Sequence, residues 1–253
     1  MLLGGSTTTP FDLIFTLFGT RVRVHPFFWL ISVLLGQGIL SSPNWMELLI
    51  TWIAAVFLSI LLHEFGHVWM WRVFGVRADI LLHSMGGLAI PDYDAPKRWQ
   101  RILVSFAGPA IQLILYAILS FGFFHLWKES LTSPILISFI AFLMIINLSW
   151  PLINLLPIYP LDGGQMVREL CQMVATRSEM VNSRPALIVS LWISIGTALA
   201  VTLYILMPNF GYRQPINLPV GPFMAVVAIV MAVNNYQELQ QMSGRRGPLD
   251  DDW

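Results

Sequence analysis

The sequence predicts an α-helical polytopic membrane protein of about six transmembrane helices with a small membrane-associated β element. Of the 253 residues, 56% are hydrophobic and only 11% are charged, whereas soluble domains carry about 25% charged residues. Six apolar segments are long enough to cross a bilayer with local tilt or thinning. Outside these segments, one alternating stretch and one glycine-containing stretch have the pattern of short strands.

Composition also limits the partners and the kinds of site. The formal net charge is zero, which argues against nucleic acid as a partner because such proteins present a basic surface. Cys171 is the single cysteine, so an internal disulfide and a cysteine-rich metal site are both excluded. Any metal must therefore be held by His and carboxylate side chains.

Residues 1–26 are predicted to form an N-terminal interfacial β-hairpin. Arg21, Val22, Arg23 and Val24 alternate in polarity directly after a Gly-Thr pair, a pattern typical of a strand that leaves a turn. An amphipathic interfacial segment fits this stretch equally well. No cleavable signal peptide is evident, so we expect the first membrane helix to act as an uncleaved insertion signal.

A six-helix membrane domain is expected over residues 27–242, followed by a polar disordered tail over residues 243–253. The six segments lie near residues 27–41, 48–71, 102–126, 134–157, 186–207 and 219–234. The first and the last are short for a full span of about 20 residues.

Internal prolines and two connecting segments complete the outline. Pro109, Pro151 and Pro157 interrupt the third and fourth segments, and such breaks are tolerated where neighbouring helices satisfy the freed carbonyls. Residues 76–101 have strand character. Residues 163–184 are predicted to form a cytoplasmic amphipathic helix.

Basic residues are divided unevenly between the two sides of the membrane. With six crossings, twelve of the fourteen Lys and Arg residues fall on one side, and only Lys128 and Arg213 fall on the other. The positive-inside rule then places both termini in the cytoplasm. Because His63 precedes Arg72 by nine residues, it is expected about 13 Å inside the boundary, in the cytoplasmic half of the bilayer.

The motif His63-Glu64-Phe65-Gly66-His67 lies inside the second apolar segment. Residues i and i+4 of a helix point the same way, so the two imidazoles can hold one zinc ion. Glu64 can take a proton from a water on that metal. Ionisable side chains within a membrane-length segment are costly and indicate a functional site. The alternative is a pair of interior histidines that bridge helices.

A second polar motif follows the fourth segment. Two histidines and a water leave a catalytic zinc one protein ligand short, and Asp162 precedes two glycines whose backbone freedom lets a carboxylate turn toward the bundle. Asp162 could instead cap a helix that begins at Gly163. Asn154 could donate to the oxyanion formed at a peptide carbonyl, or serve helix packing. Asn147 is expected to pack.

The pairing of HEFGH with NLLPIYPLDGG resembles the site-2 protease family of intramembrane zinc metalloproteases, whose signatures are HExxH and N-x-x-P-x-x-P-x-D-G. The resemblance extends over nearly the whole chain. It implies His63, His67 and Asp162 as the ligands of one zinc ion. It further implies Glu64 as general acid and base, and Asn154 as a substrate or oxyanion contact.

The same resemblance implies a substrate and a way to bind it. The strand with Gly86 and Gly87 looks like the family's membrane-embedded strand, which would accept an unwound substrate by strand addition; a simple turn is the alternative. The expected substrate is a single-span membrane protein within the lipid bilayer, commonly cut first by another protease in this family. The expected function is therefore intramembrane proteolysis.

Two other functions are compatible with buried His and Asp residues. A membrane metal transporter would need polar residues along a complete transmembrane path, whereas here they cluster in the inner half. A catalytically silent scaffold of the same fold would have no need of Glu64 as a base. The intact motif favours the protease.

Overall fold

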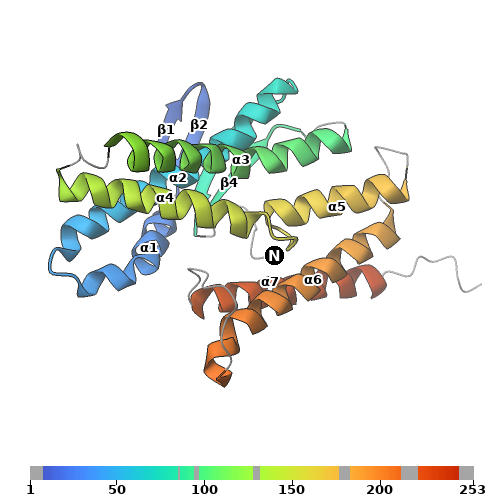
Figure 1. The fold of residues 1–253 in the computed structure, drawn as a ribbon. Helices are drawn as coiled ribbons and strands as arrows, with labels where there is room; N and C mark the ends of the chain where they lie inside the picture. Colours follow the sequence, from blue (N-terminus) through green and yellow to red (C-terminus); the bar gives the residue numbers. More distant parts are fainter. Residues whose placement is uncertain are drawn as a thin grey trace, which may run out of the picture. The chain divides into compact units, whose positions relative to one another are not determined.

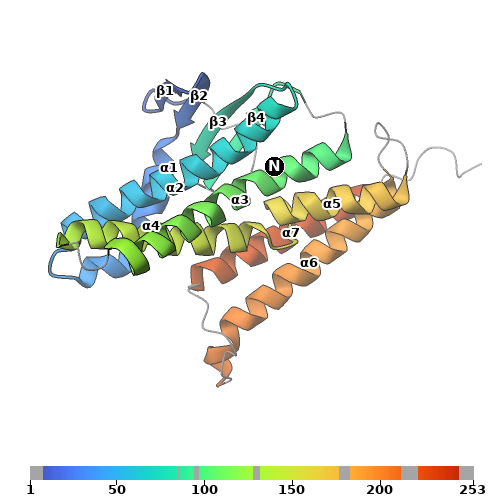
Figure 2. The same cartoon turned by 45° about the horizontal axis from the view of Figure 1, so that its top comes forward.

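The computed structural model describes residues 8–84, 86–93, 97–127, 132–176, 183–211 and 222–244. The chain forms two compact units, which are described separately below. The first contains Met1–Ala95 and Phe106–Leu152, and the second contains Pro96–Ser105 and Ile153–Trp253. The elements of both are labelled in Figures 1 and 2.

A four-stranded sheet belongs to the first unit, and its strands follow the order β1-β2-β3-β4. β1 pairs antiparallel with β2, β2 pairs parallel with β3, and β3 pairs antiparallel with β4. The strands are β1 (Leu13–Leu17), β2 (Thr20–Val24), β3 (Ala78–His83) and β4 (Gly86–Pro91). β1 and β2 form an antiparallel hairpin within residues 1–26, and it forms one sheet with a second hairpin from residues 78–91. Its predicted place at the membrane interface stays a prediction.

Local sequence explains the first hairpin. Phe18 and Gly19 join the strands with φ values of 49° and 71°, the left-handed conformation that a two-residue type I′ turn requires at both positions. Val22 and Val24 are fully buried, whereas Arg21 is exposed. Period-two alternation therefore turns one face of β2 toward the core.

The helical part of the first unit is built on α2. Its elements are α1 (Pro26–Leu35), the 3-10 turn η1 (Gln37–Ser41), α2 (Trp45–Val73), α3 (Arg98–Gly122) from residue 106 on, the π-helical turn η2 (Phe123–Trp127), and α4 (Pro134–Asn154) up to residue 152. Strands β3 and β4 pack against α2. Arg72 in the last turn of α2 donates from Nη2 to Thr20 Oγ1 at 2.7 Å, which ties the end of the helix to the start of β2.

The second unit contains the first residues of α3 and the chain from residue 153. Its further helices are α5 (Asp162–Ala175), α6 (Arg184–Leu206), the 3-10 turn η3 (Met207–Phe210) and α7 (Pro222–Gly244). α6 and α7 lie side by side, and α5 packs against α6 (Figures 1 and 2). One buried core joins the 155–161 loop to α6 and α7 through Ile158, Ala198, Met231 and Ala232.

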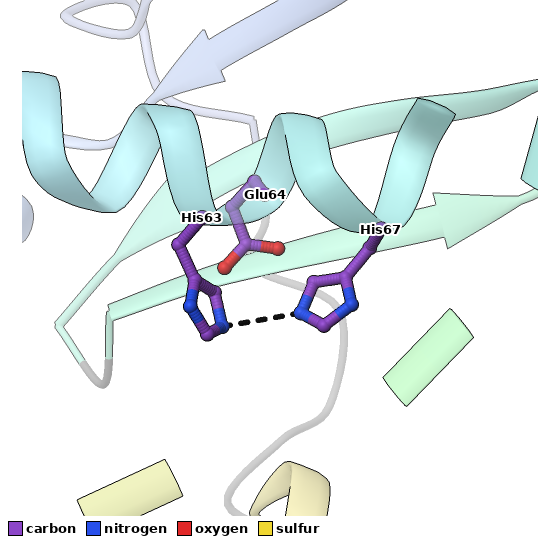
Figure 3. Close-up of side chains that lie close together, drawn as sticks. All are labelled: His63, Glu64 and His67. Carbon is purple, nitrogen blue, oxygen red and sulfur yellow. Dashed lines mark hydrogen bonds between the residues drawn. The ribbon is translucent and has the colours of Figure 1, made fainter. Parts of the chain in front are cut away.

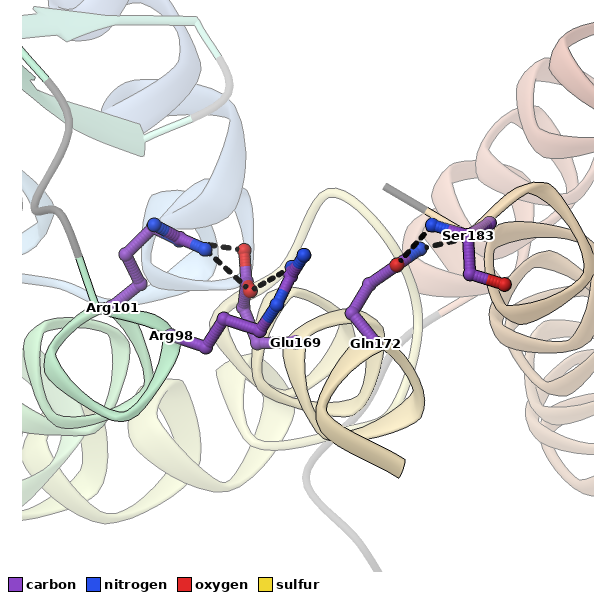
Figure 4. Close-up of polar contacts among 5 residues, drawn as sticks. All are labelled: Arg98, Arg101, Glu169, Gln172 and Ser183. Atoms are coloured by element: carbon purple, nitrogen blue, oxygen red, sulfur yellow. Dashed lines mark hydrogen bonds and ion pairs between the residues drawn. The ribbon is translucent and has the colours of Figure 1, made fainter. Parts of the chain in front are cut away.

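Charged side chains hold α3 and α5 together within the second unit. Arg98 donates from Nη1 to Glu169 Oε2 at 3.1 Å, and Arg101 donates to both Glu169 oxygens at 2.8 and 3.0 Å (Figure 4). The exposed fraction of the Arg98 side chain is only 2%. Burial of an arginine needs such charge-assisted bonds.

Four helices of the described ranges are long and apolar enough to cross a membrane, which agrees with four of the six predicted segments. They are Trp45–Val73, Arg98–His125, Pro134–Asn154 and Arg184–Phe210. The predicted count of six is not confirmed. The first segment divides at Gly36 into a ten-residue helix and a 3-10 turn, and α7 becomes polar from Asn234 onward.

Two predicted polar segments lie partly outside the described residues. The amphipathic helix predicted over residues 163–184 is present as α5, which ends at Ala175, and residues 177–182 are outside the description. The predicted tail over residues 243–253 is outside it from residue 245 on.

Candidate active site

The two histidines of α2 face each other inside the first unit. Their Nε2 atoms are 3.1 Å apart, and the side chains project from successive turns of the helix (Figure 3). His63 is 3% exposed and His67 is 6% exposed. The helical spacing of four residues therefore brings two ring nitrogens to one buried point, as predicted.

This pair fits zinc. Tetrahedral zinc with Zn–N bonds of about 2.0–2.1 Å places two imidazole nitrogens about 3.3 Å apart, close to the separation in the protein. Neutral imidazole nitrogens are ordinary zinc ligands. The donor chemistry and the spacing thus agree with a zinc site at this point.

Small residues let α3 approach α2 at the histidines. A Cβ added at Gly66 would lie 2.6 Å from the Ala107 carbonyl oxygen. A Cβ added at Gly108 would overlap His67 Nε2 and lie 2.9 Å from His63 Nε2. Gly108 therefore leaves room for the facing nitrogens, and a larger residue there would occupy the space between the helices.

Glu64 lies beside the pair and against the sheet. Its side chain is 3% exposed, and one ligand atom from each of His63, Glu64 and His67 lies within 4.8 Å of the others (Figure 3). A Cβ added at Gly87 would overlap the Glu64 carboxylate. The carboxylate thus lies directly against the backbone of β4, where only glycine fits.

Gly86 and Gly87 are strand residues and do not form the simple turn that was the alternative. Gly86 opens β4 with φ +110°, which disfavours any side chain there. A Cβ at Gly86 would lie 2.8 Å from Trp150 Cζ2. β4 is the last strand of the sheet, and no strand within the described residues pairs with its outer edge.

A buried amide on α3 contacts the histidine pair. Gln112 Oε1 lies 2.8 Å from His63 Nδ1, and Gln112 Nε2 donates to the Ser59 carbonyl at 3.1 Å. Sequence reasoning missed both residues. Ser59 lies four residues before His63, and Gln112 lies four residues after Gly108, each as a polar residue within an apolar segment. These positions, one helical turn from His63 and from Gly108, were the signal that could have indicated them.

Asp162 and Asn154 belong to the second unit. Asp162 is 8% exposed and is the first residue of α5. Leu161 is the N-cap residue, and Asp162 lies in the first turn of the helix. Asn154 is the half-buried last residue of α4. Their predicted roles as zinc ligand and oxyanion contact stay predictions.

The loop before Asp162 is fastened to α6 and α7. The Tyr159 N–H donates to Ser194 Oγ at 2.9 Å, and Asn235 Nδ2 donates to the Tyr159 carbonyl at 2.8 Å. A Cβ at Gly164 would overlap the Tyr159 backbone. The two glycines after Asp162 thus allow the loop to fold back tightly on the start of α5.

Within the first unit the structure brings together His63, Glu64 and His67, with Gly87 against the glutamate. Asn154 and Asp162 belong to the second unit. Asn154 ends α4 and Asp162 begins α5, so they flank the loop that carries Pro157 and Pro160. Asn147, predicted to pack, is fully buried on α4 and bonds Ser59.

Comparison with known proteins agrees with the motifs. The Synechocystis sp. protein sll0528 is 31% identical over 182 residues, which are 66% of this chain and 46% of that protein. Zinc metalloprotease MJ0392 of Methanocaldococcus jannaschii is 30% identical over 162 residues, 62% of this chain and 44% of that protein. Stage IV sporulation protein FB of Bacillus subtilis is 29% identical over 152 residues, 58% of this chain and 46% of that protein. The chain spans a little under half the length of these relatives.

One solved structure has a similar fold, and one family model matches more than half of the chain. The structure is similar to that of the Site-2 Protease from Methanocaldococcus jannaschii, with a TM-score of 0.54 at 22% identity over 90% of this chain and 95% of that chain. The model of Peptidase family M50 matches residues 51–135 and 122–203, which include HEFGH, Asn154 and Asp162. The chain therefore belongs to peptidase family M50, as its resemblance to the site-2 proteases predicted.

Proposed function

We propose that this protein is an intramembrane zinc endopeptidase, which hydrolyses peptide bonds within or near the transmembrane segments of other membrane proteins. One observation carries the proposal: the buried Nε2 atoms of His63 and His67 are 3.1 Å apart, and the neighbouring Glu64 carboxylate lies against the strand glycine Gly87. Two metal-binding nitrogens, a carboxylate base and a sheet edge are the parts that such a hydrolase needs.

His63, His67 and Asp162 are the proposed ligands of one zinc ion per chain. Catalytic zinc usually takes three protein ligands and keeps one position open. Asp162 is supported by its burial and by the match to the family's second motif. The sequence has a single cysteine, Cys171, so the ligands of a metal are expected to be His and carboxylate side chains. When bound, zinc lowers the pKa of water and polarises the scissile carbonyl.

Glu64 and Asn154 have the proposed roles in proton transfer and charge stabilisation. Glu64 accepts the proton of the attacking water and passes it to the leaving amine. Its near-complete burial excludes bulk water and strengthens its electrostatic effect on the reaction. The Asn154 amide donates to the carbonyl oxygen that becomes negative.

Gly86 and Gly87 are proposed to bind the substrate. A substrate helix must unwind before hydrolysis because its carbonyls are already hydrogen-bonded. The outer edge of β4 offers backbone groups to an extended segment, which would add as a further strand. The contact between Gly87 and Glu64 supports this position, because a segment on that edge would run past the base.

We further propose six membrane segments, with α1 and α7 added to the four apolar helices, and both termini in the cytoplasm. This orientation rests on the distribution of Lys and Arg and puts the active site in the cytoplasmic half of the bilayer. The proposed substrate is a single-span membrane protein. Comparing a full-length substrate with one shortened outside the membrane tests whether an earlier cut is needed.

The decisive experiment reconstitutes the purified protein with a single-span substrate in lipid vesicles. Glu64→Gln is expected to retain zinc and to lose at least about 100-fold in cleavage rate, because it removes the base. Asp162→Asn is expected to lose both zinc and activity, and a zinc chelator should inactivate the wild type. Glu47→Gln, an exposed substitution on the same helix, serves as the matched control.

The outcomes separate the proposed functions. Cleavage that survives Glu64→Gln contradicts the proposed mechanism. Metal that crosses the vesicle membrane without any cleavage would identify a transporter. Zinc binding without either activity in the wild type would favour a scaffold.

A further inference from the structure

A fully buried glutamine of α3, Gln112, contacts His63 through the ring nitrogen that does not face His67. Gln112 Oε1 lies 2.8 Å from His63 Nδ1, whereas His63 Nε2 faces His67 Nε2. Gln112 has no exposed surface. The two nitrogens of the His63 imidazole therefore have different partners, the Gln112 amide at Nδ1 and His67 at Nε2.

The Ser59 carbonyl sets the orientation of the Gln112 amide. Gln112 Nε2 lies 3.1 Å from that oxygen, which can only accept a hydrogen bond. The amide must therefore turn its NH₂ group to Ser59, and its oxygen is left to face His63. Since Ser59 lies four residues before His63 in α2, its carbonyl also accepts the helical bond from the His63 N–H.

This orientation determines which nitrogen of His63 carries the proton. The amide oxygen is an acceptor, so a hydrogen bond to it requires a proton on Nδ1. In the neutral imidazole Nε2 is then the nitrogen with the free electron pair. That electron pair is on the side of His67, where the proposed zinc ion would bind.

A separate bond joins the same helical turn to α4. Asn147 Nδ2 donates to Ser59 Oγ at 2.8 Å and to the Leu143 carbonyl at 2.9 Å, and Asn147 and Ser59 are both fully buried. Asn147 contacts the hydroxyl of Ser59, whereas Gln112 contacts its carbonyl. Two buried amides thus reach one residue, but only Gln112 also reaches a histidine.

We propose that Gln112 is a positioning residue for the metal site, which holds the His63 ring and its tautomer so that Nε2 is presented to zinc. The proposal rests on the proposed function, in which His63 is a zinc ligand. Groups that accept the second N–H of a metal-binding histidine raise its basicity and fix its orientation. An amide held by a backbone carbonyl supplies such an acceptor here.

Helix packing alone would also account for a buried amide, because interhelical hydrogen bonds stabilise membrane bundles. The two explanations differ in what a substitution changes. A packing residue contributes to stability, and its loss leaves zinc affinity alone in the folded protein. A positioning residue changes zinc affinity, and an acceptor of similar shape restores it.

The test measures zinc dissociation constants of the purified full-length protein in detergent, by competition with a chelating dye, together with thermal stability. Gln112→Met keeps the shape and removes the acceptor, and it should weaken zinc binding about 10- to 100-fold. Gln112→Glu keeps an oxygen that faces Nδ1. When its other oxygen is protonated, that O–H can donate a hydrogen bond to the Ser59 carbonyl. We expect its affinity to stay within about threefold of the wild type.

Asn147→Leu is the matched control, since it removes the other buried amide bonded to Ser59. It should lower thermal stability and leave zinc affinity unchanged. The absorption spectrum of the cobalt-substituted protein gives a second readout, which should change in Gln112→Met and match the wild type in Asn147→Leu.

Three results would overturn the inference: a folded Gln112→Met protein with wild-type affinity, an equal loss of affinity in Asn147→Leu, or no recovery in Gln112→Glu.

If Gln112→Met does not fold, Gln112→Asn takes its place, because its amide is one methylene too short to reach Nδ1. Wild-type affinity in that variant overturns the inference. Failure of the wild type to bind zinc would instead contradict the proposed function.

Discussion

The first unit and the second unit both bury polar side chains between helices, and the partners of those side chains differ. In the first unit Ser59, Gln112 and Asn147 have no exposed surface. They form a connected set of hydrogen bonds that ends at His63. Polar groups in this unit are therefore arranged around a side chain that can bind a metal.

In the second unit the buried or partly buried polar side chains join one helix to another helix, or a helix to the backbone of a loop. Arg98 and Arg101 bond Glu169 across α3 and α5. Gln172 exchanges two hydrogen bonds with the backbone of Ser183 just before α6, at 2.9 and 2.7 Å (Figure 4). Asn235 bonds the Tyr159 carbonyl. These contacts position helices and a loop.

This difference indicates that buried polar side chains have two roles in the protein: they surround a possible metal ligand in the first unit, and they join helices and a loop in the second. A buried polar group must be hydrogen-bonded, whatever its role, so satisfaction alone does not reveal function. The residue at which a series of hydrogen bonds ends is more informative about function. In the first unit a substitution of Gln112, the amide that contacts His63, should alter zinc binding. In the second unit a substitution of Glu169, Gln172 or Asn235 should chiefly alter stability.

The largest effect is expected from a substitution that places a methyl group at the two histidines of the first unit. Gly108→Ala would place a methyl group against both Nε2 atoms, where an added Cβ overlaps His67 Nε2 and lies 2.9 Å from His63 Nε2. We expect zinc affinity to fall by about 100-fold or more, measured by chelator competition. Gly196→Ala in α6 is the control, because an added Cβ there meets nothing within 4 Å, and it should bind zinc normally.

Wild-type zinc affinity in Gly108→Ala would mean that α3 does not limit the space around the two histidines. The functional distinction between the units would then lose its clearest support.

Much of the site follows from sequence because its parts are close in the chain. His63 and His67 are brought together by the geometry of one helix. The alternation in residues 20–24 agrees with the N-terminal hairpin, although it fits an interfacial segment equally well, and the left-handed residues Phe18 and Gly19 form the two-residue turn of the hairpin. The burial of Asp162 and the tight loop before it agree with the two glycines that follow.

Features that depend on distant segments were not predictable in the same way. β2 pairs with β3 although 53 residues lie between Val24 and Ala78, and no local pattern specifies that register. The contact of Gln112 with His63 depends on how α3 is rotated against α2. The interruption at Gly36 likewise depends on packing, because a Cβ there would lie 2.6 Å from the Trp52 ring.

A smaller effect is expected from the ion pairs of the second unit. Glu169→Gln removes the charge that Arg98 and Arg101 share, and Arg98 is nearly fully buried. Hydrogen bonds to charged groups of this kind contribute about 2 kcal/mol, so the unfolding midpoint in denaturant should fall. Zinc affinity of the folded variant should match the wild type, and a parallel loss of affinity would contradict the separation of roles.

The smallest effect is expected at the pair between α5 and α7. Arg168 Nη2 lies 2.8 Å from Glu238 Oε1, with side chains 23% and 33% exposed, and the guanidinium carbon also lies 4.6 Å from the centre of the Tyr159 ring. Partly exposed ion pairs contribute about 0.2–1 kcal/mol. Glu238→Gln should therefore change stability by no more than about 1 kcal/mol.

Arg168→Gln should cost more than Glu238→Gln, because it also removes the contact with Tyr159, worth about 0.5–1 kcal/mol. Unfolding of the two single variants and the double variant in denaturant gives the coupling energy of the pair. A coupling near zero, with Arg168→Gln still destabilising, would assign the role of Arg168 to the tyrosine. Because the Tyr159 carbonyl is already held by Asn235, Arg168 would then be a second support for the loop that leads to Asp162, and the second unit's polar groups would be linked to the proposed site after all.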